Sequence, residues 1–209
     1  MALPPRLVVA TKNTDKTREV RAVLAAVAPG VEVVEGAGWP DVAETGATLE
    51  ENALLKARAV AAATGLPALA DDTGLEVDAL GGAPGVHTAR YAGDSSDEPG
   101  AAYAANRAAL LAALRGVADR RARFRTVVAL VIPGGAEMVA EGVLAGWITT
   151  SERGGGGFGY DPIFEVQGRT LAEMGEEEKN RISHRARALT ALAAAPGETS
   201  PPSLPGPVR

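Results

Sequence analysis

The stretch ALADDTG, residues 68–74, is a short apolar run that passes directly into two carboxylates and a turn-forming Thr-Gly pair. Its first three residues predict a buried strand, because a short apolar run bounded by turn residues is typical of one. Asp71 and Asp72 then stand at the predicted carboxyl end of that strand, and a second strand is predicted over residues 75–79. Ligands of open α/β sheets bind outside the carboxyl ends of strands. The stretch therefore predicts an α/β fold with a binding site beside the two carboxylates.

Predicted strands and helices alternate on both sides of this stretch, and a hairpin follows later in the chain. The helix over 49–63 opens with a capping box of Thr48 and Glu51. The helix over 99–115 carries Tyr103 on its predicted apolar side. Early alternation followed by a hairpin predicts an α/β fold with a mixed sheet. The other predicted strands span 6–10, 31–34, 123–132, 137–148 and 163–166, and the other predicted helices span 16–28 and 183–195.

Composition narrows the classes of partner and chemistry. The chain has 209 residues, enough for one large domain or two closely fused lobes, and a net charge of −5. A duplex-DNA binder usually has a basic excess, so no nucleic-acid polymer is expected, whereas a small phosphorylated ligand needs only a few local cations. The absence of cysteine excludes thiolate chemistry. No apolar run approaches the ~18 residues of a membrane span, and the N-terminal run is too short for a signal peptide, so no membrane contact and a cytoplasmic location are expected.

Lysine is rare in the chain, because only four of its 21 basic residues are lysines. Lys12 and Lys16 lie just after the first predicted strand, where the next helix begins. A strand-to-helix loop offers free backbone N–H groups and a helix N-terminus favours anions, so this loop is a candidate phosphate site. The alternative is that each lysine is a solvated surface residue. The P-loop pattern G-x-x-x-x-G-K-[ST] is absent, which argues against a Ras-like or ATPase-like mechanism.

Acidic residues in two predicted loops are candidates for binding a metal ion. Asp71 and Asp72 could together hold Mg²⁺ and orient a water molecule, because Mg²⁺ prefers carboxylate oxygens and substrate phosphates. Glu44, in the loop before the helix at 49–63, is a further candidate ligand. The alternative is a turn in which the aspartates serve only local hydrogen bonds.

The segment GGGGFGYDPIF, residues 154–164, combines glycines with three of the eight aromatic residues of the chain. A glycine loop that carries rings can close over a flat base by stacking. The alternative is a linker whose rings anchor the next strand. Further along, Lys179, His184 and Arg185 form a cation-rich segment after three consecutive glutamates. For His184 the alternative is an ordinary surface histidine.

Five segments occur in one order along the chain. They are ATKNTDK (10–16), ETGATLEENALLKA (44–57), ADDTGLEVDALGGAPGVHTARYAG (70–93), GGFGYDPIF (156–164) and EEKNRISHRARAL (177–189). Each one alone is weak evidence, but the five in this order are highly specific. Together they resemble the Ham1-type inosine triphosphate pyrophosphatase family, and the resemblance covers about residues 6–193.

The resemblance implies a fold and a reaction. The implied fold is α/β, with an elongated mixed β-sheet flanked by helices and two lobes around a central nucleotide-binding cleft. The implied reaction is Mg²⁺-dependent hydrolysis of ITP, dITP and XTP to the monophosphate and pyrophosphate, which clears deaminated purines from the nucleotide pool. We therefore expect a nucleotide substrate, Mg²⁺ as cofactor and a homodimer. We also expect a single domain over residues 1–195 and a disordered Pro-rich tail over 196–209.

The resemblance also implies roles for individual residues. Glu44 and Asp72 are expected to bind Mg²⁺, with Asp72 as the proton acceptor for the attacking water, and Asp71 and Lys16 are expected to support catalysis. The expected substrate-binding residues are Thr11, Lys12, Asn13, Thr14, Asp15, Lys16, Lys56 and Thr73, and, around the base, Phe158, Gly159, Tyr160, Asp161, Lys179, His184 and Arg185.

Two departures and two rival functions accompany the resemblance. Lys12 stands where the family often has a small residue, and Thr73 replaces a frequent serine but keeps the hydroxyl. One rival is a Maf-type nucleotide pyrophosphatase for pyrimidine or modified nucleotides, against which the segment 179–185 argues. The other is a catalytically silent nucleotide-binding module, against which Glu44, Asp72 and Lys16 argue.

Overall fold

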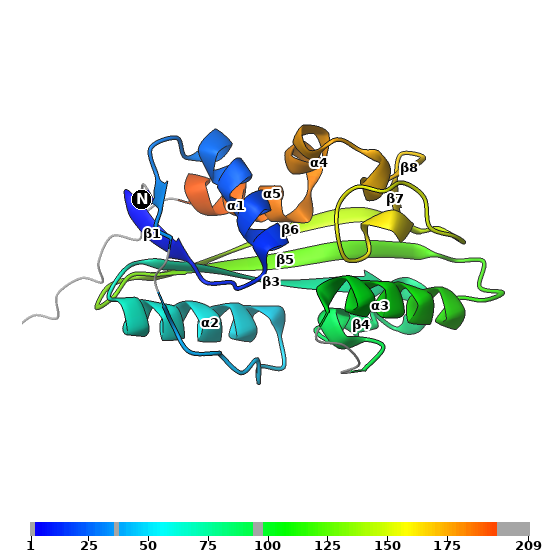
Figure 1. Ribbon diagram of the computed structural model, residues 1–209, viewed down its shortest axis with the longest axis horizontal. Helices are drawn as coiled ribbons and strands as arrows, with labels where there is room; N and C mark the ends of the chain where they lie inside the picture. Colours follow the sequence, from blue (N-terminus) through cyan, green and yellow to red (C-terminus); the bar gives the residue numbers. More distant parts are fainter. Residues whose placement is uncertain (1–2, 36–37, 94–97, 196–209) are drawn as a thin grey trace, which may run out of the picture.

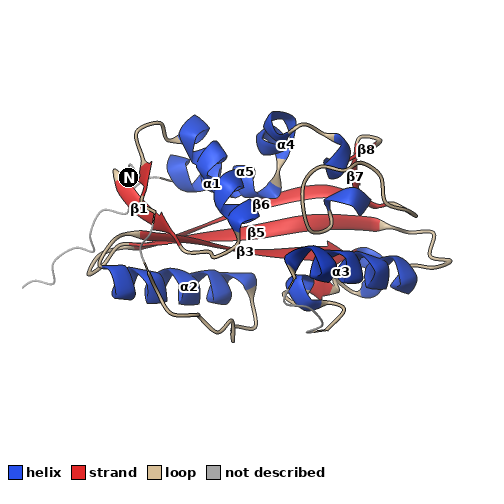
Figure 2. Cartoon of the chain, in the orientation of Figure 1, coloured by secondary structure: helices blue, strands red, loops and turns tan. Residues whose placement is uncertain are grey.

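The computed structural model describes residues 3–35, 38–93 and 98–195 of the chain. These residues form an elongated mixed β-sheet with helices on both faces (Figures 1 and 2). The predicted α/β class is therefore confirmed, whereas the division into two lobes stays a prediction. None of the described helices is long and apolar enough to cross a membrane.

The described chain forms an eight-stranded sheet in the order β2-β1-β3-β5-β6-β7-β8, and β4 pairs with β3 beside this path. β1 runs parallel to β2 and to β3, and the other pairs are antiparallel. The strands are β1 (Arg6–Val9), β2 (Glu32–Val33), β3 (Ala68–Val77), β4 (Pro84–Gly85), β5 (Arg121–Val131), β6 (Glu137–Ile148), β7 (Phe164–Val166) and β8 (Arg169–Thr170).

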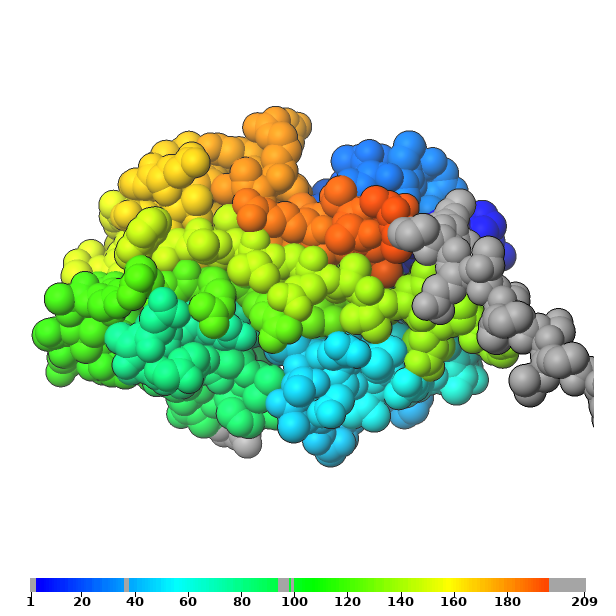
Figure 3. All heavy atoms as spheres, turned by 180° about the vertical axis from the view of Figure 1, so that it is seen from behind, coloured from blue at the N-terminus to red at the C-terminus, as the bar shows by residue number. Residues whose placement is uncertain are grey.

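Helices cover both faces of the sheet. α1 (Thr14–Val27) and α5 (His184–Ala194) pack on one face, and α2 (Leu49–Thr64) packs on the other (Figure 1). In the view from behind, the yellow-green surface of β6 runs between orange α5 and cyan α2 (Figure 3). The remaining helices are α3 (Pro99–Ala113) and α4 (Glu176–Ile182), with short 3₁₀ helices η1 (Asp78–Leu80), η2 (Thr88–Arg90), η3 (Asp161–Ile163) and η4 (Leu171–Glu173).

Alternate residues of β5 supply cores on opposite faces of the sheet. Val128 and Leu130 pack with α1 and α5, whereas Val127 and Ala129 pack with α2. This alternation follows from the strand, in which successive side chains point to opposite faces. A third core, around Phe124, lies toward the other end of the sheet and includes residues of α3 and β7. Residues of the α2 core and of the Phe124 core line the cleft described below.

β3 is one continuous strand, which corrects the predicted division into strands at 68–70 and 75–79. Asp71 pairs with Val128 and Asp72 with Val127 in an antiparallel ladder to β5 that runs the whole length of β3. Aspartate and glycine are poor strand formers, but pairing with a long central neighbour outweighs this local preference. The two carboxylates therefore lie in the middle of a strand and not at its carboxyl end.

The carboxyl end that forms the site belongs to β1. Val8 pairs with Ala68 and Val9 with Leu69, so β1 reaches only the first residues of β3. β1 then ends while β3 continues, and the loop after β1 leaves the sheet beside the middle of β3. The tendency of α/β proteins to bind ligands at the carboxyl ends of strands applies to this loop.

Most predicted elements are present within a few residues of their predicted bounds. α2 opens with the predicted capping box, in which Thr48 Oγ1 accepts from Glu51 N at 3.1 Å and the Glu51 carboxylate accepts from Thr48 N at 3.2 Å. α4 was not predicted, because five of its seven residues are charged and it lacks an apolar stripe. Tyr103 lies at the cleft and not in the apolar core of α3. The tail predicted over 196–209 lies outside the described residues.

Candidate active site

The loop after β1 turns into α1 around the side chain of Asn13. Asn13 Oδ1 accepts hydrogen bonds from the backbone N–H groups of Asp15 at 2.9 Å and Lys16 at 3.1 Å, which caps α1. Thr11 Oγ1 accepts from Asn13 N at 3.2 Å. Asn13 and Lys16 border a cleft. The positive end of the α1 dipole therefore lies beside this cleft, where it favours an anion.

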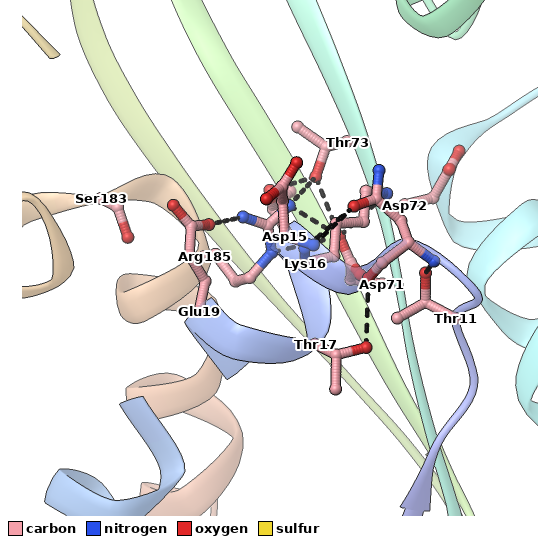
Figure 4. A network of polar contacts seen from close by, with 12 residues as sticks. Thr11, Asp15, Lys16, Thr17, Glu19, Asp71, Asp72, Thr73, Ser183 and Arg185 are labelled. Atoms are coloured by element: carbon pink, nitrogen blue, oxygen red, sulfur yellow. Dashed lines mark hydrogen bonds and ion pairs between the residues drawn. The ribbon is translucent and has the colours of Figure 1, made fainter. Parts of the chain in front are cut away.

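Asp71 connects cations of α1 and α5 on one face of the sheet (Figure 4). Its Oδ2 lies 3.0 Å from Arg185 Nη2 and 3.4 Å from Lys16 Nζ. Arg185 also forms an ion pair with Glu19 of α1. Burial alone would raise the pKa of Asp71, but attraction to Lys16 and Arg185 outweighs it and holds that pKa far below the ordinary range. Asp71 is therefore a buried anion that orients two cations.

Asp72 points to the opposite face, toward α2. Its Oδ1 accepts a hydrogen bond from Lys56 Nζ at 2.9 Å, and its Oδ2 accepts one from Asn52 Nδ2 at 3.4 Å. Burial raises the pKa of Asp72 and the charge of Glu44 adds to the rise, against the opposing attraction of Lys56. The Asp72 carboxylate is therefore held in a fixed direction at the border of the cleft.

Glu44 and Asp72 converge on one cation, the ammonium of Lys56, which donates to Glu44 Oε1 at 2.8 Å. Burial opposes ionisation of Glu44, but attraction to Lys56 outweighs it and lowers the pKa of Glu44. Mg²⁺ typically takes one or two carboxylates and completes its shell with water and substrate phosphates, so this pair fits Mg²⁺. Across the described residues, no group of three or more His, Cys, Asp or Glu side chains could hold a metal ion. A metal here would therefore share its coordination with substrate and solvent.

The loop before β7 is held by the buried carboxylate of Asp161. Asp161 Oδ2 accepts from Phe158 N at 2.9 Å and from Lys179 Nζ at 2.6 Å. Gly157 has a φ of 68°, and a Cβ there would lie 2.1 Å from Asp161 Oδ2, so this turn requires glycine. Lys179 Nζ lies 4.7 Å from the centre of the Phe158 ring, a cation–π contact. The loop thus presents one aromatic ring to the cleft beside a cation.

Two residues predicted for the base pocket also have structural partners. The Tyr160 side chain is buried and its hydroxyl donates to Thr88 O at 2.9 Å, so it anchors the loop to η2. His184 is also buried, which excludes the alternative of a surface histidine. Its ring stacks on Phe124 with centres 4.5 Å apart and planes at 17°. Burial and the charge of Arg185 hold the pKa of His184 well below its ordinary value, so the ring is neutral at pH 7.

Two adjoining cavities make up the cleft. The first, which we call the ring end, has a volume of ≈ 830 Å³ that includes space open to solvent, and it is bounded by the glycine loop, α4 and α5. The second, which we call the lysine end, has a volume of ≈ 750 Å³ that also includes space open to solvent, and three lysines line it. Asn13, Lys16 and Glu44 border both cavities, and Asp72 borders the first. The carboxylate pair therefore lies where an aromatic end meets a cationic end.

Most of the predicted site residues border these cavities. Those that do are Thr11, Lys12, Asn13, Lys16, Glu44, Lys56, Asp72, Thr73, Phe158, Gly159, Tyr160, Asp161, Lys179, His184 and Arg185. Asp71 lies behind Arg185 and Lys16. Thr14 and Asp15 line neither cavity, because successive helix residues point in different directions, and Asp15 pairs with Arg18 at 2.9 Å. Lys12 is exposed and pairs with Asp41 at 2.5 Å.

Glu19, Asn52 and Tyr103 are among the site residues that the sequence-based prediction missed. Glu19 contacts both Lys179 and Arg185, and Asn52 contacts Asp72. Glu19 stands one turn after Lys16, and Asn52 one turn before Lys56, so helical spacing from a predicted lysine was the available signal. Tyr103 gave no such signal, since its contacts are with residues distant in the sequence.

The sheet, the capped helix and the two-ended cleft define a class: an α/β protein that can hold a small anionic ligand carrying a flat ring. The chain matches the model of the Ham1 family over residues 7–195, and it belongs to that family.

Individual relatives agree with this assignment. The chain is 54% identical over 188 residues to the dITP/XTP pyrophosphatase of Symbiobacterium thermophilum, which covers 88% of this chain and 91% of the relative. It is similar to the solved Ham1 protein of Staphylococcus aureus, with a TM-score of 0.77, 39% identity, and coverage of 90% and 96% of the two chains. A solved nucleoside-triphosphatase / dITP/XTP pyrophosphatase of Mycobacterium abscessus gives a TM-score of 0.69, 45% identity, and coverage of 91% and 100%.

Proposed function

We propose that this protein is an enzyme that hydrolyses ITP, dITP and XTP to the monophosphate and pyrophosphate, and so clears deaminated purines from the nucleotide pool. The observation that carries the proposal is the cleft, in which a ring end and a lysine end meet at Glu44 and Asp72. The name dITP/XTP pyrophosphatase, carried by relatives about half identical to this chain, supports the same activity.

The cleft suggests how the nucleotide lies. A purine stacks on Phe158 at the ring end, and the triphosphate extends toward Lys16 and Lys56. A triphosphate carries close to four negative charges, which repel a nucleophile. Lysines and the N-terminus of α1 reduce this charge and stabilise the charge that develops on the leaving pyrophosphate. Lys12 adds a further cation once it leaves Asp41.

Asp72 accepts the proton of the attacking water. Lys56 and Asn52 fix the direction of its carboxylate, so its effect as a base comes from its position. A positioned general base contributes about 10²–10⁴-fold to the rate. Glu44 and Asp72 would hold Mg²⁺ together with the substrate, and the ion would supply positive charge at the phosphates.

Selectivity for a 6-oxo purine follows from donors at the ring end. Lys179 and Arg185 can only donate hydrogen bonds. They can donate hydrogen bonds to the oxygen at position 6 of hypoxanthine or xanthine. The amino group of adenine at the same position is itself a donor and cannot accept these bonds. Arg185 already forms ion pairs with Glu19 and Asp71, so only some of its N–H groups remain to donate to a base.

The test is a product analysis with ITP, XTP, GTP, ATP and dTTP, each with Mg²⁺. We expect IMP and pyrophosphate from ITP at a rate far above that for ATP or dTTP. Preference for dTTP would favour the Maf-type alternative. Binding of ITP without any product would favour the silent nucleotide-binding module. A parallel series with EDTA, and with Mg²⁺ restored, tests the metal.

Three further expectations belong to this proposal. They are a homodimer, a cytoplasmic location, and a domain over 1–195 followed by a tail over 196–209. Sedimentation of the purified chain tests the first of them.

A further inference from the structure

Tyr103 of α3 bridges the two ends of the cleft. Its hydroxyl accepts a hydrogen bond from Asn13 Nδ2 at 2.8 Å. Its ring lies 6.0 Å from the Phe158 ring, tilted by 41°. Asn13 borders both cavities, and Phe158 borders the ring end. One side chain therefore contacts the capped start of α1 and the glycine loop at once.

The bond to Tyr103 fixes the amide of Asn13. The Asn13 oxygen accepts from two backbone N–H groups of α1, so the amide nitrogen points away from the helix and toward Tyr103. Burial raises the pKa of Tyr103, which keeps the phenol protonated. A protonated phenol accepts from the amide and keeps its own proton for donation. Without the hydroxyl, only the helix end would restrain the Asn13 side chain.

Other residues hold α3 in place, so Tyr103 is not needed to anchor the helix. Arg107, one turn further along, donates to Gly159 O at 3.0 Å and pairs with Glu152 at 2.9 Å. Asn106 donates to Ala89 O at 2.9 Å. Leu110 is fully buried in the core. Tyr103 therefore projects from a fixed helix toward two other residues of the site, Asn13 and Phe158.

We propose that Tyr103 is a positioning residue that sets the separation between the ring that stacks on the base and the phosphate-facing start of α1. The inference rests on the proposed function, since it takes the base to lie at Phe158 and the phosphates at Asn13 and Lys16. The hydroxyl acts on the phosphate side through Asn13. The ring acts on the base side through Phe158. Substitutions can remove the two contacts separately.

The experiment compares Tyr103→Phe with Tyr103→Leu, using calorimetric binding of tripolyphosphate and of inosine as probes of the two ends. Tyr103→Phe keeps the ring, so we expect tripolyphosphate to bind about 3- to 10-fold more weakly and inosine to bind as in the wild type. Tyr103→Leu should weaken both probes. Tyr91→Phe is the matched control, because Tyr91 packs at the edge of the third core, and it should change neither. In ITP hydrolysis, Tyr103→Phe should lower kcat/KM by the same factor as tripolyphosphate binding.

A double-mutant cycle with Asn13→Ala tests whether the hydroxyl acts through Asn13. We expect Asn13→Ala with Tyr103→Phe to bind tripolyphosphate no more weakly than Asn13→Ala alone. Additive losses, unchanged tripolyphosphate binding in Tyr103→Phe, or equal losses for both probes in that variant would each overturn the inference. Wild-type chain that binds both probes but leaves ITP intact would count against the proposed function alone, and the Tyr103 comparison would stand.

Discussion

Asp71 and Asp72 are consecutive residues of β3 whose carboxylates serve opposite faces of the sheet. Asp71 pairs with Arg185 of α5 at 3.0 Å, whereas Asp72 pairs with Lys56 of α2 at 2.9 Å. The separation follows from the strand, which turns successive side chains to opposite faces. Asp71 therefore lies in a buried cluster of ion pairs, whereas Asp72 borders the cleft. Substitutions of these neighbours should have different consequences.

Replacing Asp72 with asparagine should abolish most turnover and leave the fold intact. The amide cannot accept the proton of water, so kcat for ITP should fall by about 10²–10⁴-fold. Lys56 keeps Glu44 as a partner, so the melting temperature should change little. Steady-state kinetics and a thermal melt measure the two effects. Hydrolysis near the wild-type rate would remove Asp72 from the role of base.

Replacing Asp71 with asparagine should instead destabilise the protein. The Asp71 and Arg185 side chains are each only 2% exposed, and the substitution leaves Arg185 with a single carboxylate partner. Removing one partner of a buried ion pair costs about 3–5 kcal/mol. Urea denaturation of Asp71→Asn and Asp72→Asn, side by side, measures the difference. Equal losses of stability would show that Asp71 has no special anchoring role.

The contrast between these two residues shows which parts of the site could be predicted from the sequence. The order of the motifs along the chain identified most residues of the cleft. Helix starts could also be predicted, because signals such as the Thr48–Glu51 capping box are local in the sequence. The continuity of β3 could not be predicted, because it depends on pairing with β5, more than forty residues further along the chain. Without that pairing, Asp71 and Asp72 look like equivalent residues of a turn.

The buried ion cluster of Glu19, Asp71, Lys179 and Arg185 could not be predicted either, because it joins residues that are distant in the sequence. Lys179 and Arg185 were predicted as free donors for a base, but Glu19, from α1, contacts both of them. Nothing near Lys179 in the sequence indicates that a carboxylate of the first helix lies beside it. A buried cation needs a counter-charge, so the need for such a partner follows from physical chemistry, although its identity does not.

Replacing Gly142 of β6 with alanine should disturb α5 and, through it, the ring end of the cleft. An added Cβ would lie 2.1 Å from His184 O and 2.4 Å from Ala188 N, both backbone atoms of the helix. Overpacking of this kind costs about 1–3 kcal/mol, and it would also shift His184 and Arg185. Denaturant melts and kcat/KM for ITP measure the two effects. Gly100→Ala is the control, because nothing lies within 4 Å of its added Cβ. Similar behaviour of the two variants would mean that α5 adjusts without cost.

His184 should make the stability of the protein depend on pH below about 6.5. Its folded-state pKa is depressed, so the unfolded chain binds a proton that the folded chain refuses. Stability from this source is complete above the unfolded pKa of about 6.5 and is lost as the pH falls below it. Between pH 6.5 and 5.5 the loss should reach about 1 kcal/mol. Urea melts of His184→Gln should show a smaller loss over this interval, whereas His87→Gln, at an exposed position, should follow the wild type. An identical slope in all three proteins would contradict the assignment.

Arg185 offers the sharpest test of base recognition, although its buried contacts restrict the choice of variant. Alanine at this position would leave Glu19 and Asp71 without their shared cation, so loss of folding would obscure any change in selectivity. Arg185→Lys keeps the charge but removes the planar fork of donors, so it is the variant to test.

A charge-assisted hydrogen bond from Arg185 to the base would contribute about 1.5–3 kcal/mol, so kcat/KM for ITP should fall by about 10- to 100-fold in Arg185→Lys. ATP, which has no 6-oxo group to receive the bond, should be affected far less. Arg187→Lys, two positions along the same helix and bonded to backbone carbonyls, is the matched control and should leave both substrates unchanged. Equal losses for ITP and ATP would move Arg185 from the base to the support of Asp71, and selectivity would then rest on Lys179 and the Phe158 loop.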